Sequence, residues 1–286
     1  MNRRQLIALC GGVVPLAGCL GGDSSPGGGT ETDGTPTTDD PAGTTTGAGE
    51  TAVTVSESVA VGDGTVTLDA VVTTESFVHL TTPDSLGVSG EDQYVFANVS
   101  LDGVSPAADE FVLDVGSTTT RPAGRYGYRD TTVDGESITS YYADEGGSLL
   151  FEVPESLDAE AGRIELSVDD ETASWRLPSA VLDELARAPP GFDLRTFAIE
   201  PAWSRGPADF SVIVENTADV DGTFRAALNQ SGPGYAPLAT VIRPVGAGES
   251  VTVERTESLF GGTNGEVRFT FAWPGGTEER VVDFGE

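Results

Sequence analysis

The sequence predicts an all-β protein made of two β-sandwiches. From residue 51 onward, apolar and polar residues alternate over short stretches, which is the period of a half-buried strand. Gly, Pro and Asp separate these stretches, as turn residues do between strands. After the N-terminal segment, only residues 178–187 have the spacing of a helix. These three observations favour packed antiparallel sheets over any helical or alternating α/β architecture.

The first block, residues 51–177, contains many short strand candidates. Thr65–Val71 alternates strictly between apolar and polar residues. The further candidates are Tyr94–Leu101, Glu110–Val115, Ser148–Val153, Arg163–Val168 and Thr172–Leu177. An isolated hairpin is only marginally stable, so we expect these strands to form two sheets packed face to face.

Residues 178–191 are expected to form a short helical linker. Ser179 is a candidate N-cap, and Val181, Leu182 and Leu185 share one face of the helix. The sequence Pro-Pro-Gly at 189–191 ends the helix and marks the boundary between the blocks. Each block is large enough to enclose a core, so each is expected to fold alone.

The second block, residues 192–286, contains seven strand candidates, a number that matches an immunoglobulin-like sandwich. They are Leu194–Glu200, Asp209–Glu215, Thr223–Asn229, Thr240–Pro244, Ser250–Arg255, Glu266–Trp273 and Glu279–Phe284. Asp221 followed by Gly222 predicts a turn between the second and third of these strands.

The N-terminal segment has the features of an export signal. Arg3 and Arg4 precede an apolar stretch, Leu6–Leu16, which is shorter than the ~20 residues that span a bilayer. Residues 16–19, Leu-Ala-Gly-Cys, resemble the lipobox of prokaryotic lipoproteins. This resemblance implies that residues 1–18 are a signal peptide and that Cys19 carries a lipid. The chain is then anchored at the outer face of the cell membrane.

The paired arginines, Arg3 and Arg4, also resemble a twin-arginine (Tat) signal, which exports folded proteins. A general secretory signal carries basic residues at the same place and is the alternative. Residues 19–50 are almost entirely Gly, Thr, Asp, Ser, Pro, Ala and Glu, and cannot bury enough apolar area to offset the entropy of ordering. We therefore expect a disordered tether with a span of ~30 Å.

The charge of the chain excludes one class of partner. There are 46 acidic residues, 15 basic residues that are all Arg, and a net charge of −31, which becomes −33 once residues 1–18 with their two Arg are removed. Such a chain repels nucleic acid, so no nucleic-acid partner is expected. An acid excess without Lys resembles the proteins of salt-loving archaea. A merely acidic surface protein is the alternative.

Few residues are available for chemistry. His79 is the single His, and Cys19 would be the single Cys of the mature chain, so neither a blue-copper site nor a closed zinc site can be assembled. A Ser-His-Asp triad would depend on His79 alone. Asp219 and Asp221 resemble part of a calcium loop but lack its late bidentate Glu, and an acidic hairpin turn is the alternative. We expect no cofactor.

Two sequons and one aromatic cluster remain as candidate surface sites. Asn98 and Asn229 each begin an Asn-X-Ser sequence that can accept an N-linked glycan, although both fall in or at the end of expected strands. Arg125, Tyr141 and Tyr142 belong to a segment rich in Tyr and Arg, the residue types of binding hot spots. The alternative is that this cluster covers the edge of a sheet.

Two stretches resemble known families. Residues 93–101 (QYVFANVSL) and 146–158 (GGSLLFEVPESLD) resemble an immunoglobulin-like domain of unknown function found in prokaryotic lipoproteins. Residues 209–224 (DFSVIVENTADVDGTF) and 247–250 (AGES) resemble the cell-adhesion-related bacterial domain. Neither family carries a catalytic motif. The resemblance implies a non-catalytic binding or structural module whose partner is a surface-layer protein, a glycan or a neighbouring membrane protein. The alternative is a carboxylate-based extracellular hydrolase or a calcium-dependent enzyme.

Overall fold

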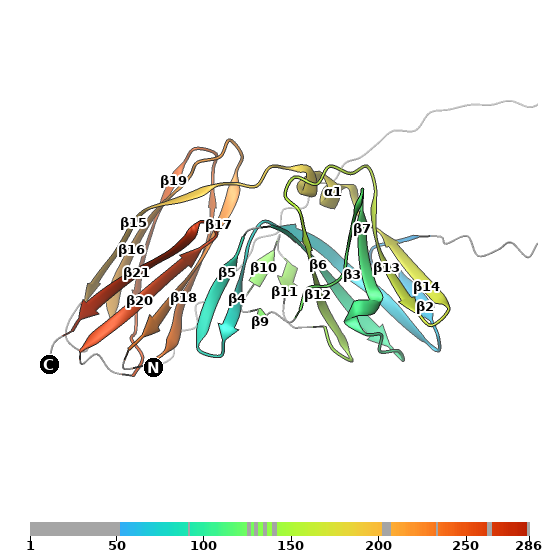
Figure 1. Cartoon of the computed structure of the whole chain (residues 1–286), viewed down its shortest axis with the longest axis horizontal. Coiled ribbons are helices and arrows are strands. Elements are labelled where there is room, and N and C mark those ends of the chain that lie inside the picture. The colour runs from blue at the N-terminus through green and yellow to red at the C-terminus, as the bar shows by residue number, and fades with distance from the viewer. Residues whose placement is uncertain are drawn as a thin grey trace, which may run out of the picture. The chain divides into compact units, whose positions relative to one another are not determined.

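The computed structural model describes residues 52–90, 92–124, 127–128, 131–133, 136–138, 142–201, 207–232, 234–261 and 265–284. Most of them lie in antiparallel sheets, and one α-helix is present among them (Figure 1). The all-β fold predicted from the sequence is therefore confirmed. The expected signal peptide and the tether, with Arg3, Arg4 and Cys19, lie outside the described residues. Within the described part of the chain, no helix is long and apolar enough to cross a membrane.

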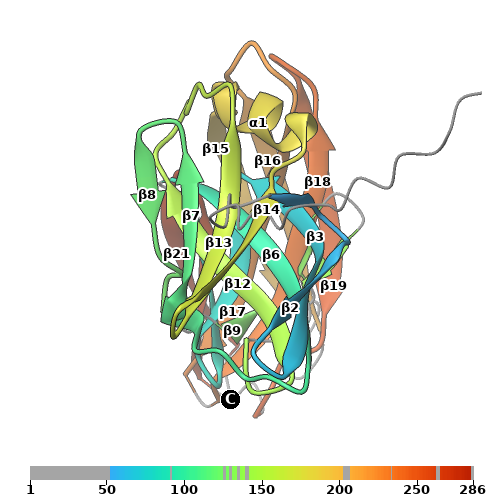
Figure 2. The same ribbon diagram turned by 90° about the vertical axis from the view of Figure 1, so that its right-hand side faces the viewer.

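Two sheets form the N-terminal sandwich, and Figures 1 and 2 show them as two layers. One sheet has the order β1-β14-β13-β7-β8 and the other has the order β12-β6-β3-β2. The first sheet consists of β1 (Val53–Thr54), β14 (Glu171–Arg176), β13 (Gly162–Val168), β7 (Phe111–Val115) and β8 (Thr118–Thr120). The second consists of β12 (Gly146–Val153), β6 (Gln93–Asp102), β3 (Gly64–Thr74) and β2 (Ser58–Val61). All pairings are antiparallel except that of β1 with β14.

The alternating residues of both sheets meet in one core. Val95, Ala97 and Val99 of β6 are buried there against the opposite sheet, which contributes Ile164 and Trp175. Trp175 is fully buried, and its indole Nε1 donates to the carbonyl of Glu57 at 3.0 Å. Two sheets around one apolar core are the arrangement of a β-sandwich.

The α-helix belongs to the same core. α1 (Ser179–Ala186) follows β14 and buries Val181 and Leu185 in the N-terminal core, with Leu182 packed at its margin. The shared face predicted from the sequence is thus the packed face. The prediction that Ser179 caps the helix is wrong, because Pro178 occupies the N-cap and no side chain caps the helix there.

Smaller elements cover the outer face of β6. A three-stranded sheet has the order β5-β4-β9, formed by β4 (Phe77–Thr82), β5 (Ser85–Ser89) and β9 (Gly127–Tyr128). Phe77 packs edge-on against Tyr94 and Phe96, with ring centroids 4.8 and 5.3 Å apart. β6 is therefore buried on both faces along much of its length. The remaining short elements are η1 (Ala108–Glu110), β10 (Thr131–Val133) and β11 (Glu136–Ile138).

A second pair of sheets forms the C-terminal sandwich around its own core. The sheets have the orders β15-β16-β19 and β18-β17-β20-β21. Their strands are β15 (Phe192–Pro201), β16 (Ala208–Asn216), β17 (Gly222–Ser231), β18 (Ala236–Val245), β19 (Ser250–Glu257), β20 (Glu266–Trp273) and β21 (Gly276–Asp283). Phe210, Phe224, Phe269 and Phe271 dominate the core. All seven strands predicted for this block are present. The division into two independently folding, immunoglobulin-like domains with boundaries at 177 and 192 stays a prediction.

The turn predicted at Asp221-Gly222 lies between β16 and β17, as expected, but it is not a hairpin. β16 pairs with β15 and β19, whereas β17 pairs with β18 and β20. The chain therefore crosses from one sheet to the other at this point.

Candidate functional site

The β4–β5 hairpin of the N-terminal half docks on β17 of the C-terminal sandwich (Figure 1). Within β17, Phe224, Ala226 and Leu228 point into the C-terminal core. Ala227, from the opposite face, is fully buried against Val78 and Leu86 of the hairpin. β17 is thus enclosed on both sides. We call this contact the seam.

A side-chain clasp holds the seam together. The Asn229 side-chain Oδ1 accepts the backbone N–H of Leu86 at 2.8 Å, and its Nδ2 donates to the carbonyl of Leu86, also at 2.8 Å. Asn229 is 8% exposed and Leu86 is 4% exposed. The amide therefore takes the place of a neighbouring strand at the outer edge of β5, and it satisfies backbone groups that burial would otherwise leave unpaired.

Polar contacts continue the seam toward the linker. Glu75, just after β3, accepts the backbone N–H of Thr223 at 3.3 Å. The Arg225 guanidinium Nη1 donates to the hydroxyl of Ser76 at 3.4 Å, and Arg225 is only 5% exposed. Because three residues of β17 contact the N-terminal half in this way, the seam is a built interface.

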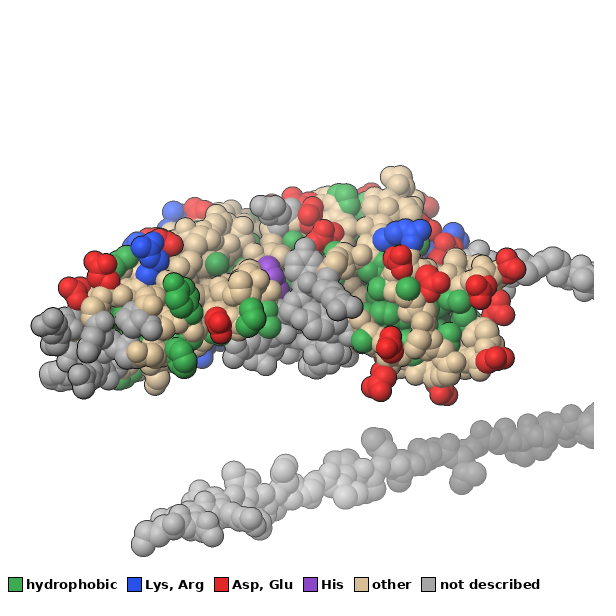
Figure 3. Space-filling model, turned by 60° about the horizontal axis from the view of Figure 1, so that its bottom comes forward, with side chains coloured by type: hydrophobic (Ala, Val, Ile, Leu, Met, Phe, Trp, Pro, Cys, Tyr) green, Lys and Arg blue, Asp and Glu red, His purple; other side chains and the backbone are tan. Residues whose placement is uncertain are grey.

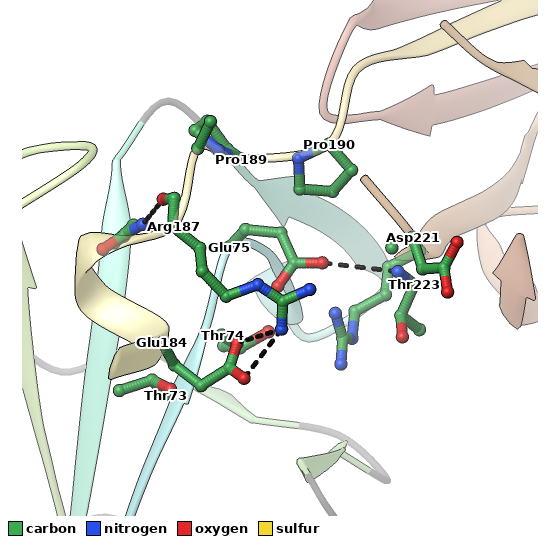
Figure 4. A pocket seen from close by; sticks show the side chains of 13 residues that line it. Thr73, Thr74, Glu75, Glu184, Arg187, Pro189, Pro190, Asp221 and Thr223 are labelled. Carbon is green, nitrogen blue, oxygen red and sulfur yellow. Dashed lines mark hydrogen bonds and ion pairs between the residues drawn. The ribbon is translucent and has the colours of Figure 1, made fainter. Parts of the chain in front are cut away.

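A pocket of about 220 Å³ opens beside these contacts, where the end of β3, the end of α1 and the start of β17 meet (Figure 4). It is lined by Thr73, Thr74, Glu75, Gln93, Glu184, Arg187, Ala188, Pro189, Pro190, Asp221, Gly222, Thr223 and Arg225. The lining is mostly polar and combines two guanidinium groups with three carboxylates. This seam pocket is the candidate functional site.

Most polar groups of the seam pocket hold parts of the chain together. Glu184 pairs with the Arg187 guanidinium at 2.8 and 3.0 Å, and the buried Gln93 donates its Nε2 to the Arg187 carbonyl at 3.1 Å. The Gln93 Oε1 has no hydrogen-bond partner among the described residues and can accept from a small polar molecule or water. The site is thus suited to joining elements and to binding a small polar molecule.

His79, the single histidine, does not line the seam pocket. It sits in β4, its ring centroid is 5.5 Å from that of Phe77, and its Nδ1 is 3.4 Å from the Ser89 hydroxyl. Burial lowers the pKa of the His79 imidazole.

The two calcium candidates lie in the crossing from β16 to β17. Asp221 lines the seam pocket, and its Oδ1 accepts the backbone N–H of Ala247 at 2.9 Å. Asp219 lies two residues earlier in the same connection. Within the part of the chain that the structure describes, no three His, Cys, Asp or Glu side chains come together as metal ligands.

The two sequon asparagines differ in their surroundings. Asn98, half-buried in β6, accepts a hydrogen bond from the Ser148 hydroxyl at 2.6 Å. Asn229 forms the clasp, so a glycan on its Nδ2 would have to replace the bond to Leu86. The folded chain therefore disfavours modification at Asn229.

Only one member of the predicted Arg125, Tyr141 and Tyr142 surface lies within the described residues. The Tyr142 hydroxyl donates to the carbonyl of Pro106 at 2.8 Å, and its ring packs edge-on against Phe111 with centroids 5.4 Å apart. Burial, and then the nearby carboxylates, raise the pKa of Tyr142. Tyr142 thus packs against the N-terminal core. Arg125 and Tyr141 fall outside the described residues.

Sequence reasoning missed the residues that build the seam. Arg225 and Asn229 lie in a strand that it did predict, and Gln93 lies one residue before another, but their burial was not predicted. The sequence of β17 did contain a signal, because small and polar residues alternate there with Phe and Leu. The same pattern is also expected of a strand whose polar face is exposed to solvent, so it did not show that this face is buried.

No family model matches the chain, and no curated protein is similar to it. Among solved structures, a β-glucosidase from Listeria innocua in complex with isofagomine is 14% identical, over 34% of this chain and 16% of that chain, with a TM-score of 0.30. DesR, a β-glucosidase from Streptomyces venezuelae in complex with D-glucose, is 8% identical over 72% of this chain and 47% of that chain, also with a TM-score of 0.30. The chain thus spans less than half the length of either. At these scores, the similarities establish neither a shared fold nor a shared activity.

Proposed function

We propose that the chain is a lipid-anchored protein of the outer cell surface that acts as a non-catalytic binding or structural module of the envelope. Residues 1–18 act as the export signal, read by the twin-arginine route through Arg3 and Arg4. Cys19 carries the lipid, and residues 19–50 hold the folded part away from the membrane. The acid excess suits a protein that works in concentrated salt.

One observation carries the non-catalytic part of this proposal. Polar groups that line the seam pocket hold backbone segments in place, one of them between the two halves of the folded part and one within the C-terminal sandwich. Glu75 binds the backbone of Thr223, and Asp221 binds the backbone of Ala247. Side chains that fix a backbone in this way serve a rigid scaffold, and a rigid scaffold suits a surface that presents a binding site.

A membrane-impermeant crosslinker applied to intact cells tests the proposal. We expect the anchored chain to co-purify with a surface-layer protein, a glycan or a neighbouring membrane protein. Arg125→Ala combined with Tyr141→Ala should weaken that association if the predicted surface contributes to it. The proposal fails if no partner is captured and the purified chain instead turns over a glycan or peptide with specific carboxylates. The carboxylate-based hydrolase or calcium-dependent enzyme would then replace it.

A further inference from the structure

Two aromatic side chains are exposed at one end of the C-terminal sandwich. Tyr235 is 64% exposed and Phe260 is 59% exposed. Tyr235 lies in the connection from β17 to β18, and Phe260 lies in the connection from β19 to β20. Because Ser231 at the end of β17 pairs with Arg268 near the start of β20, the two connections share this end. Exposed apolar side chains that lie together, unlike ones scattered singly, commonly mark a binding surface.

A buried glutamine fixes the backbone beneath one of these rings. Gln230 of β17 is 1% exposed. Its side-chain Oε1 accepts the N–H of Phe260 at 2.9 Å, and its Nε2 donates to the carbonyl of Phe260 at 2.6 Å. The oxygen and the nitrogen of the buried Gln230 amide therefore both bond to the backbone of Phe260, whose own side chain faces the solvent. The arrangement positions the Phe260 ring.

A glycine brings the two connections into contact. A Cβ atom added to Gly234 would lie 2.8 Å from Cδ1 of Phe260 and 2.9 Å from its carbonyl oxygen. The Phe260 ring thus rests against the residue that precedes Tyr235. Only a residue without a side chain permits this approach, so the two aromatic residues stand on adjoining, mutually supported loops.

The two connections themselves carry no charged residue, although Glu257 and Glu266 flank the second of them. The sequence has no charged residue between Arg225 and Arg243, and none between Glu257 and Glu266, in a chain whose net charge is −31. On the face shown in Figure 3, acidic side chains are spread over much of the described surface. The chain as a whole repels an anionic partner. Within the two connections no carboxylate is present to bind a cationic one.

We propose that Tyr235 and Phe260 form a binding platform for a neutral carbohydrate. The face of a pyranose ring presents C–H groups that pack on an aromatic ring, while its hydroxyls point outward to backbone groups such as those of Gly-rich loops. Aromatic side chains offer this contact area at low cost in conformational entropy. The inference rests on the proposed function and names the glycan as the partner.

Titration of the full mature chain in detergent with neutral oligosaccharides tests the platform. The probes are hexasaccharides of glucose, mannose, xylose and N-acetylglucosamine, with polygalacturonate as the anionic comparison. We expect at least one neutral probe to bind. Tyr235→Ala and Phe260→Ala should each weaken that binding at least tenfold. Gly234→Ala, which keeps both rings but displaces Phe260, should also weaken it.

Val281→Ala is the matched control, because Val281 is another exposed apolar side chain, 52% exposed, on β21. It should leave binding unchanged, and circular dichroism should show every variant folded. The platform is refuted if no neutral probe binds at millimolar concentration, if polygalacturonate binds more tightly, or if the aromatic variants bind like the parent. Binding to phosphatidylglycerol vesicles through the two rings would also refute it, in favour of a membrane contact. If the aromatic variants still capture the crosslinked surface partner, the platform fails while the proposed function stands.

Discussion

Replacing Asn229 with Ala should destabilise the folded chain through the loss of the clasp. The change removes two hydrogen bonds of 2.8 Å and leaves the N–H and C=O of Leu86, a residue only 4% exposed, without their partner. A lost hydrogen bond is worth about 0.5–1.5 kcal/mol, and a buried group left unpaired costs about 1–3 kcal/mol. Entry of water would reduce the total, so we expect a loss of about 2–4 kcal/mol in the free energy of unfolding.

Urea unfolding and thermal melting of the mature chain measure this loss. At about 2–4 °C per kcal/mol for a chain of this size, the melting temperature should fall by roughly 4–16 °C. Val281→Ala, at an exposed position, should change stability by less than about 0.5 kcal/mol. A loss below about 1 kcal/mol for Asn229→Ala would show that the clasp does not hold the seam, and the rigid arrangement inferred from it would be wrong.

Three further predictions concern salt and pH. Raising sodium chloride from about 0.1 M to molar concentration should raise the melting temperature. Salt screens the repulsion among 46 acidic residues, and this gain outweighs the weakening of exposed ion pairs, which are worth about 0–1 kcal/mol each. A flat or falling melting temperature would contradict this prediction. Tyr142→Phe should cost about 1 kcal/mol at neutral pH. Since folding raises the pKa of Tyr142 above its usual 10.0, the parent should lose stability as the pH rises past that value, and the variant should lose less. Because burial lowers the pKa of His79, an NMR titration of its ring should have a midpoint below 6.5. The part of the folding stability that depends on neutral His79 should then be lost as the pH falls below 6.5. A midpoint at or above 6.5 would refute the burial.

The strands that alternate cleanly could be predicted from the sequence, and their limits came within a few residues of the structure. β20 matches its predicted bounds, Glu266–Trp273, and β6 extends its prediction by one residue at each end. These strands are readable because burial of one face imposes a period of two on the sequence. β4 and β5 were not predicted, because Phe77-Val78-His79-Leu80 is a nearly continuous apolar run without that period.

The seam and the aromatic end depend on contacts that no local pattern encodes. Arg225 and Asn229 are buried only because a hairpin about 140 residues earlier in the chain covers their side of β17. Gln230 is polar and internal because it holds the backbone of Phe260, thirty residues later. The sequence could indicate strands at these positions, but not what each strand would face.

The central claim, a lipid-anchored surface protein, is tested most directly by mass spectrometry of the N-terminal peptide from chain extracted from membranes. The mature chain should begin at Cys19, this residue should carry a lipid, and Cys19→Ala protein should leave the membrane fraction. An unmodified Cys19, or a membrane-bound chain that retains residues 1–18, would contradict it.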